Sequence, residues 1–132
     1  MSVVYCPRTH SYFEHERYPL AAMLTAGVRV AIGTDSRASN PDLNLLAELR
    51  HIAATHADLS PAEILKLGTL AGAQALGRDH EVGSLTAGKL ANLAVVPLDA
   101  TNAVDPHELV LNSTAEVATT YYRGLRVARM SL

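Results

Sequence analysis

Asp35 is the residue whose position in this sequence most favours chemistry. It comes shortly after the apolar segment VRVAIG, which is rich in β-branched residues, and it is the second residue of the polar stretch TDSRASN. In parallel α/β folds, side chains at the C-terminal ends of strands build the active site. A carboxylate there can bind a hard or borderline cation and can accept a proton from metal-bound water. The tripeptide Thr-Asp-Ser is also typical of a turn with Asx-type hydrogen bonds, but the preceding strand favours the catalytic interpretation.

Other side chains that could take part in catalysis have less favourable surroundings. Cys6 ends an apolar segment without a histidine close in the sequence, which favours a small buried side chain over a nucleophile. Ser36 and Ser39 lack an evident general base, so we expect them to order the loop around Asp35. Glu48 falls on the polar side of an expected helix and is predicted to be solvated.

Four histidines are predicted to lie at the surface. His51 and His56 are five residues apart on an expected helix, a spacing that does not place them on one face, and His80 and His107 fall in expected loops. The segment GSLTAGK has glycines and a lysine without the spacing of a phosphate-binding loop, which argues against a nucleotide site.

The elements that position Asp35 are predicted to form a βαβ unit. Residues 2–6 and 28–33 read as strands, and residues 8–17 read as a loop. A helix is expected between them, with Pro19 in its first turn and Gly27 at its end. Such a unit predicts two parallel strands joined by a right-handed crossover.

Two helices and a mostly β region are expected after Asp35. Asp42 can cap a helix over 43–57 whose apolar face contains Leu43, Leu46, Leu49, Ile52 and Ala53. Another helix is expected over 60–77, with Ser60 and Glu63 in a capping box. Near residue 80 the composition changes, and a strand over 90–98 and a hairpin over 116–130 follow.

Composition excludes several classes of protein. The 132 residues are 48% hydrophobic and 18% charged, and the net charge of −2 without a basic stripe argues against a nucleic-acid partner. A single cysteine excludes an internal disulfide and fits a reducing compartment. The beginning does not read as a signal peptide, and the longest apolar run, LANLAVVPL, is shorter than the ~18 residues of a membrane span. We therefore expect a cytoplasmic protein without a membrane partner.

Several stretches, taken together and in order, resemble a known family. They are VVYCPRTHSYF, PLAAMLTAGVRVAIGTDSRASN, LLAELR, LSPAEILKLGTLAGAQALG, VGSLTAGKLANLAVV and YYRGLRVA. They resemble the C-terminal third of an amidohydrolase-superfamily enzyme, in the branch of cytosine deaminase-like and triazine chlorohydrolase-like aminohydrolases.

The resemblance implies an α/β fold made of the last two β/α units of a TIM-type (β/α)8 barrel, followed by C-terminal strands of a small β-sandwich domain. Residues 1–80 would belong to the barrel and 81–132 to the sandwich. The segments 2–6 and 28–33 would be the seventh and eighth barrel strands.

The resemblance also implies an activity. Metal-activated water would attack an sp2 carbon of a purine, pyrimidine or triazine-like ring and release an amino or halide group. Asp35 matches the family's strand-eight aspartate, which binds the catalytic zinc or iron and shuttles the proton of the attacking water. Arg8 and His10 are candidates for binding the small-molecule substrate in the intact enzyme, and His10 stands where the family loop commonly has asparagine.

The family's other metal ligands have no match in this sequence. They are a His-x-His pair and two further histidines, and the sequence contains no His-x-His. We therefore expect a fragment that is inactive by itself and holds no metal of its own. Two alternatives stay open: a small site made by His10, His15 and Asp35, and a stand-alone non-catalytic scaffold or partner-binding domain. Exposed strand edges would also allow homo-oligomers.

Overall fold

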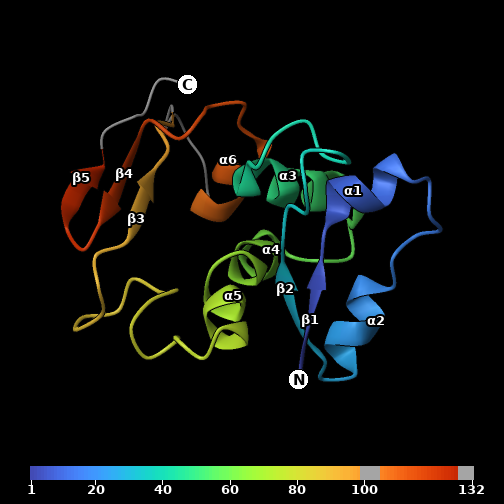
Figure 1. Cartoon of the computed structure of the whole chain (residues 1–132), viewed down its shortest axis with the longest axis horizontal. Helices are drawn as coiled ribbons and strands as arrows, with labels where there is room; N and C mark the ends of the chain where they lie inside the picture. Colours follow the sequence, from blue (N-terminus) through green and yellow to red (C-terminus); the bar gives the residue numbers. More distant parts are fainter. Residues whose placement is uncertain (99–104, 128–132) are drawn as a thin grey trace.

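The computed structural model describes residues 1–98 and 105–127. These residues form a mixed α/β structure with a parallel two-stranded sheet and an antiparallel three-stranded sheet (Figure 1). The strands are β1 (Ser2–Tyr5) and β2 (Arg29–Ile32) in the first sheet, and β3 (Leu93–Val95), β4 (Thr119–Tyr122) and β5 (Leu125–Val127) in the second. In the described ranges, no helix is long and apolar enough to cross a bilayer.

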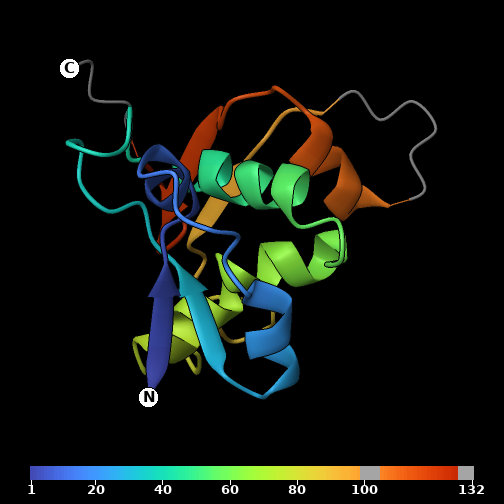
Figure 2. The same cartoon turned by 90° about the vertical axis from the view of Figure 1, so that its right-hand side faces the viewer.

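The predicted parallel pairing of the first two strands is confirmed. β1 and β2 run in the same direction, with Ser2 opposite Arg29 and Tyr5 opposite Ile32 (Figure 2). Their C-terminal ends therefore meet at one edge of the sheet, where Asp35 follows β2.

The connection between β1 and β2 holds two helices, α1 (Pro7–Tyr12) and α2 (Leu20–Thr25). The second was predicted, and Gly27, with φ +76°, follows its end. The prediction of a loop over 8–17 is wrong for residues up to Tyr12. Pro7 occupies the first turn of α1, where its fixed φ favours the helix and its missing N–H costs nothing.

Helix α3 (Leu45–Thr55) begins later than predicted. Its N-cap is Asn44, whose side chain accepts a hydrogen bond from the N–H of Ala47, whereas Asp42 accepts one from the N–H of Asn44. Leu43 is consequently outside the helix and 60% exposed, although the predicted apolar face contained it.

The single helix predicted over 60–77 is two helices, α4 (Pro61–Leu67) and α5 (Leu70–Ala75). The capping box of Ser60 and Glu63 is confirmed. The break falls at Gly68, because glycine is a weak helix former and α3 approaches it closely. A Cβ at Gly68 would lie 2.8 Å from Cδ1 of Leu49.

The core lies between the parallel sheet and the helices. Figure 1 shows α4 and α5 on one side of the β1–β2 pair and α2 on the other. The buried cluster joins strand and helix residues: Tyr5, Leu20, Val30, Ile32, Leu49, Ile52, Ile64, Leu67 and Leu111.

The antiparallel sheet has strand order β3-β4-β5. The predicted hairpin is confirmed over residues 119–127, and residues 128–130 of its predicted range lie outside the described residues. Its turn residues Arg123 and Gly124 both have positive φ, as a type I′ turn requires. Helix α6 (Pro106–Asn112) was not predicted, although Asp105 and Pro106 form a typical helix start. It packs on α3 and α4 and adds Leu111 to the core. The domain boundary near residue 80 stays a prediction.

Candidate functional site

Asp35 presents an exposed carboxylate just beyond the C-terminal end of β2. Its φ is +58°, a left-handed conformation that is uncommon for residues with a side chain and that Asp tolerates better than most. Its Oδ2 accepts a hydrogen bond of 3.1 Å from Oγ of Ser39. The loop therefore holds one oxygen of the carboxylate and turns the side chain toward solvent.

Ser39 links this loop to α1. It is 6% exposed, and its Oγ lies 3.2 Å from Oγ1 of Thr9, which is 8% exposed. Because Ser39 donates to Asp35, the Thr9 hydroxyl is left to donate to Ser39. Ser36 accepts a hydrogen bond from the N–H of Ala38. The predicted role of both serines in ordering the loop is confirmed.

Cys6 lies under the Asp35 loop, half-buried rather than fully buried. A Cβ at Gly33 would lie 2.8 Å from Cγ1 of Val4 and 3.2 Å from Sγ of Cys6, so only glycine allows this approach. Burial, followed by the charge of Asp35, raises the pKa of the Cys6 thiol, and the backbone at Asp35 and Gly33 opposes this shift only in part. A thiol with a raised pKa is a poor nucleophile, in line with the prediction.

The prediction that Glu48 is solvated is wrong, because its side chain is 0% exposed. Its Oε2 accepts a hydrogen bond of 2.9 Å from the backbone N–H of Arg8, and its Oε1 accepts one of 2.5 Å from Nδ2 of Asn40. The same Nδ2 donates to the carbonyl oxygen of Thr34 at 2.7 Å. The signal that could have revealed this burial is the four-residue spacing from Ile52, which places both side chains on one helix face.

Arg8 is engaged within the chain. Its Nη1 lies 2.7 Å from Oδ1 of Asp42 and 3.8 Å from Oε1 of Glu48, and its side chain is 18% exposed. The hydrogen bond from Arg8, followed by that from the Asn44 N–H, lowers the pKa of the Asp42 carboxyl. A role of Arg8 in substrate binding stays a prediction.

His10 belongs to a group of aromatic rings beside β1. Its ring centroid lies 5.7 Å from that of Tyr5, 5.5 Å from that of Tyr18 and 5.1 Å from that of His15. Burial, followed by the neighbouring His15, lowers the pKa of His10. A neutral imidazole offers one donor and one acceptor to a ligand.

The predicted surface position of the other four histidines is correct for only some of them. His56 is 2% exposed rather than at the surface, and its Nε2 lies 3.5 Å from the hydroxyl of Tyr5. Burial lowers the pKa of His56 and raises the pKa of Tyr5 to about 12. His51 is half-exposed and lies 2.8 Å from Oγ of Ser11. His80 and His107 are exposed as predicted, but His107 lies in α6 and not in a loop.

The described residues cannot bind a catalytic metal by themselves, and they could only supply part of its ligands. A catalytic zinc needs about three protein ligands and an open position. Within residues 1–98 and 105–127, no group of three His, Cys, Asp or Glu side chains could hold a metal ion, so the alternative site of His10, His15 and Asp35 does not form. Among the residues that the structure describes, Asp35 combines exposure, a position just after a strand end and a restrained carboxylate.

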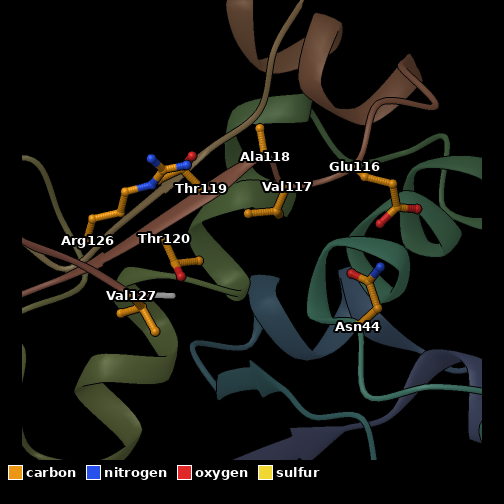
Figure 3. Close-up of a pocket in the computed structure, with 8 residues that line it drawn as sticks. All are labelled: Asn44, Glu116, Val117, Ala118, Thr119, Thr120, Arg126 and Val127. Atoms are coloured by element: carbon orange, nitrogen blue, oxygen red, sulfur yellow. The ribbon is translucent and has the colours of Figure 1, made fainter. Parts of the chain in front are cut away.

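A pocket of about 550 Å³ lies elsewhere, between α3 and the antiparallel sheet. Figure 3 shows Asn44 and Glu116 on one side of it and Thr120, Arg126 and Val127 on the other. Its lining holds one cation and one carboxylate but none of the residues around Asp35. The candidate site is therefore the edge of the parallel sheet and not this pocket.

Comparison with known proteins identifies a family and several relatives. Residues 1–127 match the model described as the amidohydrolase family. The 5-methylthioadenosine/S-adenosylhomocysteine deaminase of Moorella thermoacetica is 36% identical over an alignment of 119 residues, and the match covers 85% of this chain and 28% of that protein. The S-triazine hydrolase of Gordonia rubripertincta is 34% identical over an alignment of 110 residues, and the match covers 78% of this chain and 23% of that protein.

Solved structures that resemble this chain include enzymes of the same kind as these relatives. An adenosine deaminase from Xanthomonas campestris with bound zinc superposes with a TM-score of 0.86 and 31% identity, over 95% of this chain and 31% of that one. The chain thus has the fold of a part of such enzymes and spans less than a third of their length.

Proposed function

The chain belongs to the amidohydrolase family, and from that premise we propose that it is part of a metal-dependent hydrolase acting on non-peptide C–N bonds. The substrate is a purine, pyrimidine or triazine-like ring, and the reaction is deamination, with removal of a halide as the close variant. Relatives named as deaminases and as a triazine hydrolase support this class of substrate.

The parallel pair β1–β2 corresponds, in this proposal, to the last two strands of a (β/α)8 barrel within residues 1–80. Residues 81–132 contribute to a small β-sandwich. The helical connection between two parallel strands and the separate antiparallel sheet support this assignment. Active sites of such barrels lie at the C-terminal ends of the strands, which is where Asp35 lies.

The observation that carries the proposal is the exposed, left-handed Asp35 with one oxygen held by Ser39. Asp35 would be one of the residues that hold the metal, and its carboxylate, oriented by Ser39 at Oδ2, would take up the proton of the attacking water. Zinc, when bound, lowers the pKa of water to about 7 and so supplies a hydroxide nucleophile. Asp35 would then return the proton to the leaving group.

His10 and Arg8 line the substrate side of this site in the proposal. A neutral imidazole at His10 can donate to or accept from the polar edge of a heteroaromatic ring. Arg8 can reach a carbonyl or anionic group while its guanidinium stays paired with Asp42.

A second candidate is a non-catalytic partner-binding domain. Val4 of β1 is 61% exposed, and β1 pairs only with β2 among the described strands. An open strand edge of this kind can pair with another chain, including a second copy of this one.

The test is a chimera in which residues 1–132 replace the matching 31% of the Xanthomonas campestris deaminase. We expect a folded chimera with about one zinc per chain and with adenosine deamination. The variant Asp35→Asn should lose the zinc and should lower kcat/KM roughly 10³-fold, because it removes both a ligand and a proton acceptor.

The matched control is Asp79→Asn, which changes a carboxylate outside the candidate site. It should leave both the zinc and the rate unchanged. A folded chimera that keeps zinc and activity after Asp35→Asn would refute the role of Asp35, and a folded chimera without zinc would favour the non-catalytic domain.

A further inference from the structure

Glu48 connects the loop of Asp35 to helix α1 through a single buried carboxylate. We propose that Glu48 is a positioning residue, which fixes the backbone at Asp35 and sets the candidate substrate residues of α1 relative to it. This inference rests on the proposed function, in which Asp35 holds the metal. Glu48 acts through other residues and touches neither metal nor substrate.

The first contact of Glu48 controls the peptide in front of Asp35. Asn40 is 3% exposed, and its two Nδ2 hydrogens serve Oε1 of Glu48 and the carbonyl of Thr34. The carbonyl of Thr34 is part of the peptide group that joins Thr34 to Asp35, and φ of Asp35 is the rotation between this peptide group and the rest of Asp35. A hydrogen bond that fixes the carbonyl therefore also restrains the left-handed φ of +58°, which directs the Asp35 side chain.

The second contact controls the beginning of α1. This helix has no side-chain cap of its own, and Pro7 offers no N–H, so the N–H of Arg8 is the first free donor of the helix. Glu48 accepts that hydrogen bond from α3 at 2.9 Å. Arg8 and His10, the candidate substrate residues, are thereby tied to the same carboxylate as the loop of Asp35.

The contacts require a carboxylate and not an amide. Both hydrogen-bond partners of Glu48 donate, and the Arg8 guanidinium lies 3.8 Å from Oε1. A glutamine would place an NH2 group against one donor. The Arg8 N–H can only donate, whereas the Asn40 amide can rotate, so the glutamine oxygen would stay with Arg8. Asn40 would turn its oxygen to the new NH2 group and release the Thr34 carbonyl.

This reasoning separates positioning from a general contribution to stability. Glu48→Gln should loosen the loop of Asp35 while α1 keeps its contact, and Asn40→Ala should loosen the same loop. The control is Ile52→Val, which removes one methyl from a fully buried side chain of the same helix without touching these contacts.

The experiment is amide hydrogen exchange by NMR on the 132-residue chain, without metal, for the wild type and the three variants. In Glu48→Gln and Asn40→Ala, amides of residues 33–39 should exchange roughly tenfold faster relative to those of α4, the loss of about 1.4 kcal/mol of local stability. In Ile52→Val both regions should change by the same factor. The side-chain NH2 signals of Asn40 should shift in Glu48→Gln and stay in place in Ile52→Val.

The proposal is overturned if residues 33–39 exchange in Glu48→Gln no faster than in Ile52→Val. If Glu48→Gln does not fold, Asn40→Ala decides by the same criterion, because it leaves the bond between Glu48 and Arg8 intact. The assay contains no metal, so its result is independent of the zinc content of the Asp35→Asn chimera. An unchanged loop together with zinc loss in that chimera would refute Glu48 as a positioning residue and leave the proposed function standing.

Discussion

The backbone around Asp35 depends on how closely two strand ends can approach each other. Gly33 lies against Val4 of β1 and against Cys6, which follows that strand, and Asp35 adopts a left-handed conformation two residues later. Because Gly33 has no side chain, the start of the Asp35 loop can pack against the Cys6 thiol before the chain turns toward solvent. A larger residue at position 33 would push the carboxylate away from the end of β1.

Gly33→Ala should therefore destabilise the chain. A Cβ at 2.8 Å from Cγ1 of Val4 forces either the strand or the loop to shift, at a cost of about 1–3 kcal/mol. Urea unfolding followed by circular dichroism measures the change. The control is Gly72→Ala in α5, where the new Cβ meets nothing within 4 Å and should stabilise the helix by about 0.5–1 kcal/mol. Equal effects of the two substitutions would contradict this account of Gly33.

A buried histidine makes the stability of the fold depend on pH. Burial lowers the pKa of His56, so the unfolded chain binds a proton at a higher pH than the folded chain does. Its contribution to stability is present above the ordinary value of 6.5 and is lost as the pH falls below it. His10, whose pKa is lowered too, acts in the same direction.

We expect the free energy of unfolding to fall below pH 6.5, by at most about 1.4 kcal/mol per pH unit for His56. His56→Gln cannot be protonated in this range and should flatten the profile, while His80→Gln serves as a control that removes an exposed imidazole. Urea unfolding at about one pH unit above and below 6.5 measures the slope. If the free energy of unfolding has the same pH dependence in the wild type and in His56→Gln, protonation of His56 is not the cause of the loss of stability at low pH.

At the scale of the elements, features that depend on a few neighbouring residues were predicted correctly, whereas features that depend on contacts between distant segments were not. The capping box at Ser60 and the positive-φ turn at Arg123-Gly124 are encoded within a few residues, and both are confirmed. The break at Gly68 depends on Leu49 from another helix, which no local pattern shows.

The same division holds for the candidate site. The position of Asp35 after a strand could be predicted, since it needs only the apolar run in front of it. The hydrogen-bond partners of Glu48 could not be predicted, because Arg8 and Asn40 come from other parts of the chain. Helix periodicity places Glu48 on the face of Ile52, but it does not identify the residues that donate to its carboxylate.

Arg50 of α3 connects the helical part to the segment that leads into the antiparallel sheet. Its guanidinium donates to the carbonyl of Val110 at 3.1 Å and to that of Ala115 at 2.8 Å. Arg50→Met keeps the apolar stem and removes these donors, so we expect a loss of about 1.5–3 kcal/mol and faster proteolysis near residues 110–118.

The control for this prediction is Arg17→Met. Arg17 pairs with Asp58 at 2.9 Å, but both side chains are largely exposed, and such pairs contribute less than about 1 kcal/mol. Urea unfolding and limited proteolysis would compare the two variants. If Arg50→Met is as mild as Arg17→Met, the connection through Arg50 is not what holds the two parts together.

At the scale of the whole molecule, the chain spans 28% of the deaminase of Moorella thermoacetica, and Asp35 is the single metal ligand that we propose for it. The described residues hold no three-ligand group, and a single carboxylate binds zinc too weakly to retain it through purification. We therefore expect elemental analysis of the purified chain to find far less than one zinc per molecule, with no difference in Asp35→Ala. Zinc in a one-to-one ratio that Asp35→Ala removes would instead mean that this chain completes a site of its own around Asp35. His10 and His15 would then be the first residues to substitute, and the activity of the chain by itself would have to be measured directly.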